Sequence, residues 1–261
     1  MNIKSRIKRW LFPIWGFLPF SIRDYFASVR EKRRSKRDHY NLKKNKIIYI
    51  SDRLSVKKTI NYIDIGANKG DFLEEISRYY KMNKVVLVEP IPDTADYLKK
   101  KYLSPIYSVF QNVITDQENV PVDFFVNEFS ETSSILEIKS EMEELSKTNT
   151  KLGSKEKVMS RTLDGIFFES KMLKIDLLKI DVQGVEHRVI IGGTKALKNT
   201  KLLLVEVSFK PTFKGSCVFS EVYDLLQERD FILLEISPGF RASNNDELMQ
   251  VDALFLNTKF E

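Results

Sequence analysis

The sequence predicts a doubly wound α/β domain, in which helices cover both faces of a mostly parallel sheet. From about residue 59 onward, short apolar stretches alternate with stretches of helical apolar spacing. The apolar stretches lack the strict alternation of a half-exposed sheet, so both faces of the sheet should be buried. In YIDIGANKGD, residues 62–71, an apolar run meets an Asp and a loop of small residues. That pattern is typical of a strand followed by a helix across a bound ligand.

The strands and helices are expected in a regular order along the chain. The expected strands are TINYIDIG, KVVLVEP, IYSVFQNVIT, VPVDFFVNE, LLKIDVQG, KLLLVEVS, FILLEIS and VDALFLNT. The expected helices are DFLEEISRYYKM, PDTADYLKKKY, GVEHRVIIGGTKAL and VFSEVYDLLQERD. Pro92 and Asp93 suit the first turn of the second of these helices. RTLDGIF indicates a turn into a further helix, which Asp164 would cap.

A polar stretch interrupts this order near residues 127–160. It contains EFSETSSILEIKSEMEELSKTNTKLGSKEK, which shows neither the helical nor the strand period and predicts an insertion or loop. No internal repeat is present and nothing in the pattern requires a second globular unit. We therefore expect one domain over residues 47–261.

Residues 1–46 differ in composition from the rest and form a basic, aromatic arm. They hold 14 Lys and Arg against 3 Asp and Glu, a net charge of +11, whereas the remaining residues hold 28 against 33, a net of −5. The uncharged run between Arg9 and Arg23 is too short for a membrane-spanning helix, which needs about 20 residues. Cations beside aromatic rings suit an anionic membrane surface, and packing of the rings on the domain is the alternative. We expect no nucleic-acid partner.

The chain has one cysteine, Cys217, and two histidines. A single thiol excludes an intrachain disulfide framework and fits a reducing compartment. We therefore expect a cytoplasmic protein, either free or peripheral at the inner face of the membrane. So few Cys and His argue against a closed zinc site, and although carboxylates could hold a divalent cation, we expect no metal. No pattern in the sequence bears on oligomeric state.

The loop after the first strand narrows the choice of ligand. Gly66 and Gly70 bracket it with G-x-x-x-G spacing rather than G-x-G-x-x-G, which counts against a dinucleotide pyrophosphate. Lys69 is not followed by Ser or Thr, so a phosphate-binding P-loop is excluded. Glu89 at the end of the second strand can accept both hydroxyls of an unmodified ribose. These residues predict an adenosine ligand and leave NAD and S-adenosylmethionine both open.

Seven short segments resemble one family. They are DIGANKGDF, VEP, SETSSIL, RTLD, LKIDVQGVEHRVIIGG, LLLVEVS and VDALFL, and their order is similar to that in FkbM-type S-adenosylmethionine-dependent methyltransferases. The resemblance covers about residues 59–258, and LKIDVQGVE is its most specific element. It implies a class I methyltransferase (Rossmann-like) sheet of seven strands, in the order 3-2-1-4-5-7-6 with the last antiparallel. It also implies O-methylation of a hydroxyl on a sugar, a glycan or a secondary metabolite, with S-adenosylmethionine as cofactor.

The resemblance also implies roles for residues at the ends of the strands. The methionine end and backbone of the cofactor would be held by four residues of the glycine loop: Asp64, Gly66, Asn68 and Gly70. Glu89 would take the ribose, and Gln111 and Asn112 lie where adenine contacts are expected. Asp181, at the end of the fourth strand, would line the reaction centre.

A hydroxyl acceptor must lose a proton as it attacks the methyl group, so a nearby base would help. Asp181 is the first candidate, with a structural role in its own loop as the alternative. Glu206 ends the fifth strand at the same edge of the sheet, where a carboxylate in an apolar strand needs a partner. His187 is a third candidate because histidine titrates near neutrality, although packing is its commoner role on a helix. Ser133 and Ser134 match a family element that could approach the cofactor or the acceptor.

Three classes of function are therefore compatible with the sequence. The first is a methyltransferase acting on a hydroxyl of a small molecule or glycan. The second is an NAD-dependent Rossmann-type enzyme, which the missing G-x-G-x-x-G disfavours. The third is a non-catalytic cofactor-binding relative, disfavoured because the glycine loop, Glu89 and Asp181 occur together. The acceptor pocket is expected to be shaped by the 127–160 insertion and by SFKPTFKGS after the fifth strand.

Overall fold

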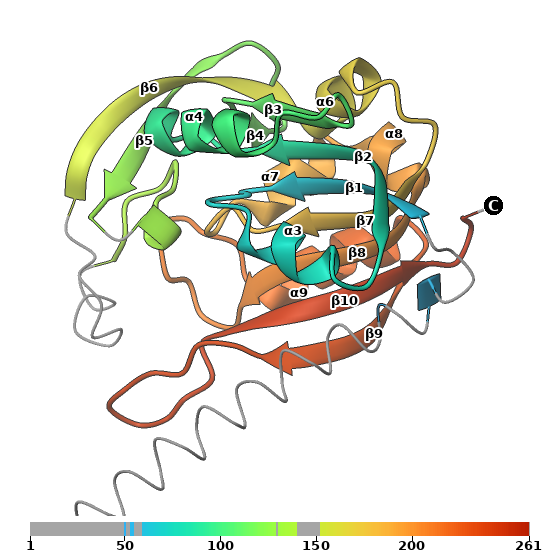
Figure 1. Ribbon diagram of the computed structural model, residues 1–261. Coiled ribbons are helices and arrows are strands. Elements are labelled where there is room, and N and C mark those ends of the chain that lie inside the picture. The colour runs from blue at the N-terminus through green and yellow to red at the C-terminus, as the bar shows by residue number, and fades with distance from the viewer. Residues whose placement is uncertain (1–49, 51–52, 55–58, 129, 140–151, 261) are drawn as a thin grey trace, which may run out of the picture. The chain divides into compact units, whose positions relative to one another are not determined.

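A seven-stranded sheet forms the centre of the domain in the computed structural model, which describes residues 50, 53–54, 59–128, 130–139 and 152–260. Its strands are β1 (Thr59–Ile65), β2 (Lys81–Val88), β3 (Tyr107–Phe110), β7 (Ile175–Ile180), β8 (Thr200–Ser208), β9 (Phe231–Pro238) and β10 (Gln250–Asn257). Across the sheet they follow the order β3-β2-β1-β7-β8-β10-β9 (Figure 1). β10 runs antiparallel to both of its neighbours, and the other pairings are parallel. Numbered within this sheet, the order is 3-2-1-4-5-7-6 with the last strand antiparallel, so the predicted class I methyltransferase fold is confirmed.

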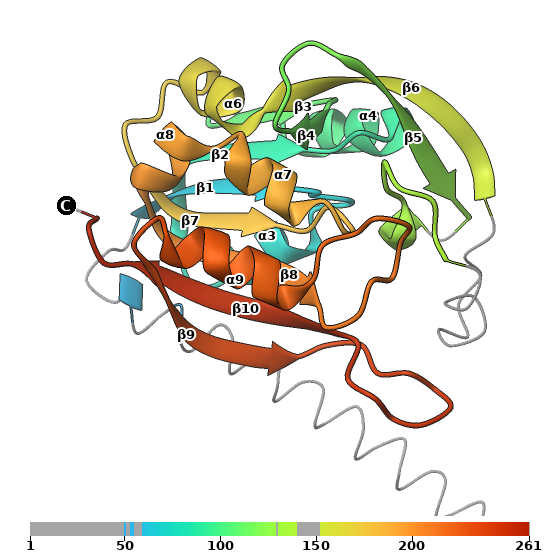
Figure 2. The same ribbon diagram turned by 180° about the vertical axis from the view of Figure 1, so that it is seen from behind.

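Helices cover both faces of this sheet (Figures 1 and 2). On one face lie α3 (Asp71–Ile76) and α4 (Pro92–Lys101). On the other lie α6 (Leu163–Glu169), α7 (Glu186–Ile191), α8 (Thr194–Lys198) and α9 (Phe219–Gln227). This layering explains why the strands are apolar along most of their length, as the sequence indicated.

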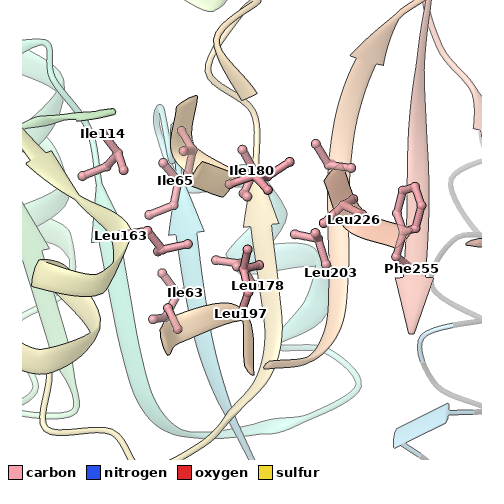
Figure 3. Close-up of a cluster of buried hydrophobic side chains, with 14 of the residues drawn as sticks. Ile63, Ile65, Ile114, Leu163, Leu178, Ile180, Leu197, Leu203, Leu226 and Phe255 are labelled. Carbon is pink, nitrogen blue, oxygen red and sulfur yellow. The ribbon is translucent and has the colours of Figure 1, made fainter. Parts of the chain in front are cut away.

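Alternation along β1 decides which side chains reach which face. Ile63 and Ile65 point to the α6–α9 side, where they pack with Leu178 and Ile180 of β7 (Figure 3). Tyr62 lies in the opposite core, with α3 and α4. Because strand side chains alternate with a period of two, Asp64 points to the same side as Tyr62. The α3 face therefore carries polar groups at the ends of its strands.

A second, three-stranded sheet has the order β4-β6-β5. Its members are β4 (Val113–Thr115), β5 (Pro121–Asn127) and β6 (Leu152–Thr162). The prediction of one strand over IYSVFQNVIT is therefore wrong, since β3 ends at Phe110 and β4 belongs to the other sheet. The Asn112 side chain between them donates a hydrogen bond of 3.1 Å to the carbonyl of Met159 in β6. This contact joins the connection between β3 and β4 to the second sheet.

The last part of the predicted 127–160 insertion is a strand rather than a loop, and that the segment is an insertion stays a prediction. Residues from Leu152 onward form β6, which pairs antiparallel with β5, and Ser130–Thr132 form a short 3-10 helix, η2. The polar character arises because Lys155 and Lys157 lie on the solvent side of the hairpin, where both form ion pairs with Asp123. Residues 140–151 lie outside the described part of the chain.

Two helix predictions also need correction. GVEHRVIIGGTKAL forms two helices, α7 and α8, with Gly192 and Gly193 between them. A side chain at Gly192 would lie 2.4 Å from the carbonyl oxygen of Thr115. Asp164 does not cap its own helix; the Thr162 hydroxyl accepts from Gly165 there. Asp164 instead accepts the backbone N–H groups of Lys195 and Ala196 at the start of α8.

The predicted arm, residues 1–46, lies outside the described residues, and its membrane contact stays a prediction. Within the part of the chain that the structure describes, no helix combines the length and apolar character needed to cross a bilayer.

Candidate active site

The structure brings together four of the predicted site residues at one edge of the main sheet. Asp64 lies in β1, Glu89 follows β2, Asp181 follows β7 and Glu206 lies near the end of β8. These four strands are neighbours in the order β2-β1-β7-β8 and are parallel, so their carboxyl ends meet at the same edge. Ligands of doubly wound sheets bind at such an edge.

The glycine loop between β1 and α3 has a left-handed backbone at three positions. Gly66 and Gly70 have φ angles of 84° and 82°, and Asn68 between them has 45°. A Cβ at Gly66 would lie 1.9 Å from the carbonyl oxygen of Asp181, and one at Gly70 would lie 2.8 Å from the hydroxyl of Tyr102. The two glycines therefore make room for the protein's own neighbouring strand and ring.

Glu89 connects the glycine loop to the end of β2. One carboxylate oxygen accepts the Asn68 N–H and the other accepts the Ile91 N–H, both at 2.9 Å. Burial raises the pKa of Glu89 to about 7, although these two donors act to lower it. Each carboxylate oxygen has a second lone pair. Glu89 can thus hold the loop and still accept a hydrogen bond from a ligand.

A row of polar side chains begins at β1 and crosses to β7. The Tyr62 hydroxyl donates to Asp64 Oδ2 at 2.6 Å. Lys179 Nζ lies 3.7 Å from Asp64 Oδ1 and 3.0 Å from Asp181 Oδ2. Asp64 is 1% exposed, and its Oδ1 is a buried atom without a hydrogen-bond partner. At the β1 end of the row, Asp64 can therefore accept one more hydrogen bond.

Gln183 continues the row from β7 to β8. Its side-chain amide donates to Asp181 Oδ1 at 2.8 Å and to Glu206 Oε2 at 2.6 Å. Its φ angle of 58° is in the left-handed region, which a residue with a long side chain rarely adopts. Burial raises the pKa of Glu206 well above its usual range, and the charges of Asp181 and Asp252 add to the rise. One amide thus supplies a donor to two neighbouring carboxylates.

The two segments expected to shape the acceptor pocket contact each other above this row. Ser134, which is 1% exposed, donates from its hydroxyl to the carbonyl of Gln183 at 2.7 Å. Ile138 and Phe213 form an antiparallel bridge, and Lys214 forms an ion pair with Glu137. The segments after η2 and after β8 therefore pack against each other beside Gln183. The neighbouring Ser133 contacts the end of β5, where its hydroxyl accepts the Asn127 N–H.

His187 lies apart from this row. The charged groups that act on it are Glu221, Arg188 and Asp116, none of which belongs to the row. Burial lowers the pKa of His187. The neighbouring Glu186 is buried and accepts the Gly184 N–H, so it fixes the loop after β7.

The two residues predicted beside adenine differ in their surroundings. Gln111 is exposed after β3, whereas the half-buried Asn112 donates to the β6 carbonyl described above. Both lie between the two sheets in sequence. Asn112 therefore has a structural role whether or not it also contacts a ligand.

Reasoning from the sequence missed Lys179 and Gln183. A signal for Lys179 existed, because a lysine inside the apolar strand LLKIDVQG needs a buried partner just as Glu206 does. Gln183 carried no such signal, since its role depends on a left-handed backbone. Over the ranges that the structure describes, no three His, Cys, Asp or Glu side chains are grouped so that they could hold a metal ion.

The strand order and the glycine turn after β1 define a class I methyltransferase. Within that class the chain belongs to the FkbM methyltransferase family, whose domain model matches residues 64–233. Members of this family use S-adenosylmethionine, so the NAD-dependent alternative is set aside.

Individual relatives are distant. The chain is 26% identical over 179 residues to the 2-O-methyltransferase NoeI of Sinorhizobium fredii (strain NBRC 101917 / NGR234), covering 65% of this chain and 72% of that one. Methyltransferase FkbM from Methylobacillus flagellatus KT is 14% identical with a TM-score of 0.47, over 77% of this chain and 44% of that one. Magnesium protoporphyrin IX methyltransferase from Synechocystis PCC 6803 is 8% identical with a TM-score of 0.44, over 99% and 98%. The present chain thus spans less than half of the FkbM structure.

Proposed function

We propose that this protein transfers a methyl group from S-adenosylmethionine to a hydroxyl oxygen of a sugar, a glycan or a related secondary metabolite. The observation that carries the proposal is Glu206, a partly buried carboxylate with a raised pKa that the Gln183 amide joins to Asp181. The distant relative named as a 2-O-methyltransferase supports an oxygen acceptor. A non-catalytic relative has no evident need for such a carboxylate.

The residues of the glycine loop fit the cofactor that the family uses. Asp64 offers a buried oxygen without a hydrogen-bond partner, which suits the ammonium group of the methionine end. Gly66, Asn68 and Gly70 give the loop the left-handed turns that open α3, and Glu89 keeps lone pairs for the ribose hydroxyls. When bound, the cofactor supplies a methyl group already activated by a sulfonium. The protein's task is then to align an acceptor oxygen with it.

Glu206 is a better base than Asp181 in this arrangement. Both oxygens of Asp181 already accept charged or amide donors, from Lys179 and Gln183. The hydrogen bonds to Glu206 come from Gln183 and Gln250, and both reach Oε2. In its ionised form, a carboxylate whose pKa is raised by burial is a stronger base than an ordinary carboxylate. Glu206 would therefore take the hydroxyl proton as the oxygen attacks the methyl group, while Asp181 positions Gln183.

The test combines cofactor binding with methyl transfer. Calorimetric titration with S-adenosylhomocysteine should show binding to wild type and to Glu206→Gln with similar affinity, and no binding of NAD. Mass spectrometry should detect methyl transfer from S-adenosylmethionine to members of a panel of neutral methyl glycosides. Loss of the base should slow that transfer by about 100-fold or more. The exposed Glu228→Gln serves as the matched control and should keep full activity.

Two results would contradict the proposal in different ways. If the folded protein does not bind S-adenosylhomocysteine, the cofactor assignment fails. If it binds but methylates only amine or thiol acceptors, the hydroxyl assignment fails. Unchanged transfer by Glu206→Gln would remove Glu206 from the mechanism.

A further inference from the structure

Lys179 is a lysine inside the buried main sheet. It lies in β7, its Cα is the register partner of Asp64 in β1, and its side chain is 11% exposed. The flanking residues Leu178 and Ile180 belong to the apolar core. A lysine is almost never buried unless its ammonium is paired. The partners of Lys179 therefore indicate its role.

Two carboxylates hold the ammonium on the cofactor side of the sheet. Lys179 Nζ is within 3.0 Å of Asp181 Oδ2, which it bonds directly. It lies 3.7 Å from Asp64 Oδ1, too far for a hydrogen bond but close enough for strong attraction in a buried site. Asp64 Oδ1 is the atom that lacks a hydrogen-bond partner. The ammonium thus leaves this oxygen without a hydrogen bond while supplying a nearby positive charge.

Without that charge Asp64 would be a poor anion. It is 1% exposed, and burial raises its pKa while Lys179 and the Tyr62 hydroxyl act to lower it. A protonated Asp64 could not pair with the ammonium group of an amino-acid ligand. The carboxylate therefore needs a buried counter-ion in order to bind a cation.

We infer that Lys179 is a positioning residue for cofactor binding: its buried ammonium keeps Asp64 ionised, so that Asp64 can bind the cationic methionine end of the cofactor. The inference deepens the proposed function and rests on cofactor binding at the glycine loop. It assigns to Lys179 no contact with the acceptor and no proton transfer. Its consequence is an effect on cofactor affinity that depends on pH.

The groups facing Lys179 from neighbouring strands support a permanent charge. Asp64 comes from β1 and Glu206 from β8, the two strands beside β7, and the charge of Asp252 acts from β10, one strand further on. Burial opposes the charge of Lys179, but Asp181, Asp64 and Asp252 outweigh it and hold the pKa of the ammonium above its usual range. Lys179 thus stays positive throughout the pH range of a binding experiment.

The test is calorimetric titration of the full chain with S-adenosylhomocysteine between about pH 6 and about pH 9, on wild type and Lys179→Met. Because one pKa unit corresponds to tenfold in an equilibrium, we expect Lys179→Met to bind about tenfold or more weakly near the acid end. The ratio to wild type should approach one as the pH rises and Asp64 ionises. Dividing the two affinities measured at the same pH cancels the effects of ligand titration and of Glu89 titration, because both proteins share them.

Three variants complete the design. Lys179→Arg keeps the charge and should bind with nearly the pH dependence of wild type, which also covers the case in which Lys179→Met does not fold. The double variant Lys179→Met with Asp64→Asn should bind weakly at all pH values, because position 64 then carries no carboxylate that could ionise and pair with the ligand's ammonium group. Lys84→Met in β2 removes a strand lysine that donates to the carbonyl of Lys171, away from the site, and should match wild type.

The outcomes separate this inference from the proposed function. If wild type binds the ligand and Lys179→Met shows equal affinity at every pH, the inference is overturned. A loss that is constant across the pH range would also overturn it, since that is the mark of a structural role alone. If wild type binds no S-adenosylhomocysteine at any pH, the proposed function itself has failed.

Discussion

Gly66→Ala tests how closely the cofactor loop depends on the end of β7. An added Cβ would meet the carbonyl oxygen of Asp181 at 1.9 Å, so strand backbone would have to move by more than an ångström. The left-handed backbone costs a residue with a Cβ about 1–2 kcal/mol, and overpacking adds about 1–3 kcal/mol. The movement would also break the hydrogen bond from the Asp181 N–H to the Ile65 carbonyl, worth about 1 kcal/mol. We therefore expect a loss of about 3–6 kcal/mol in the free energy of unfolding.

The chain offers a matched control for this substitution. Gly215 has a φ angle of 76°, close to that of Gly66, and a Cβ built there meets nothing within 4 Å. Gly215→Ala should lose only the backbone part, about 1–2 kcal/mol. Urea unfolding of the three proteins measures both losses, and titration with S-adenosylhomocysteine should show binding abolished only in Gly66→Ala. Equal destabilisation by the two substitutions would refute the argument from contact with Asp181.

Three further predictions concern pH, the Gln183 bridge and the arm. The folded pKa of Glu89, about 7, exceeds its ordinary value of 4.5, so the folded state binds this proton more tightly than the unfolded state. Glu89 thus destabilises the fold increasingly as the pH rises from about 4.5 to about 7, and Glu89→Gln should gain about 2–3 kcal/mol on wild type over that window in urea unfolding; parallel pH curves would contradict this. Gln183→Leu leaves Asp181 and Glu206 without their shared donor, and should lower kcat for methyl transfer about 10–100-fold with little change in S-adenosylhomocysteine affinity; an unchanged kcat would speak against the bridge. A chain lacking residues 1–46 should sediment less with anionic vesicles than the full chain, and equal sedimentation would remove the membrane hypothesis.

The strand order and the glycine turn after β1 could be predicted because they depend on local sequence and on family resemblance. Apolar runs mark the strands, and the positions of Asp64 and Glu89 follow from where those runs end. The boundary between the two sheets could not be predicted in this way. IYSVFQNVIT is apolar on both sides of Gln111 and Asn112, and the break depends on the distant Met159 carbonyl that Asn112 reaches.

The centre of the site was harder to predict because it depends on pairing between strands. Lys179 faces Asp64 only because β7 lies beside β1 in a particular register. Gln183 reaches two carboxylates only because its backbone is left-handed. Sequence spacing contains neither the register nor the backbone angle. It therefore identified Asp181 and Glu206 as separate candidates and missed the amide that joins them.

Ser134 links the three-stranded sheet to the candidate active site through a backbone pairing and a side-chain hydrogen bond. Its backbone pairs with Phe125 of β5, while its hydroxyl reaches the Gln183 carbonyl. We expect the glycine loop to hold the methyl donor and other stretches of chain to recognise the acceptor, one of which Ser134 joins to Gln183. Exchanging residues 121–162 together with the segment after β8 between relatives should therefore transfer the choice of acceptor and leave the glycine loop unchanged.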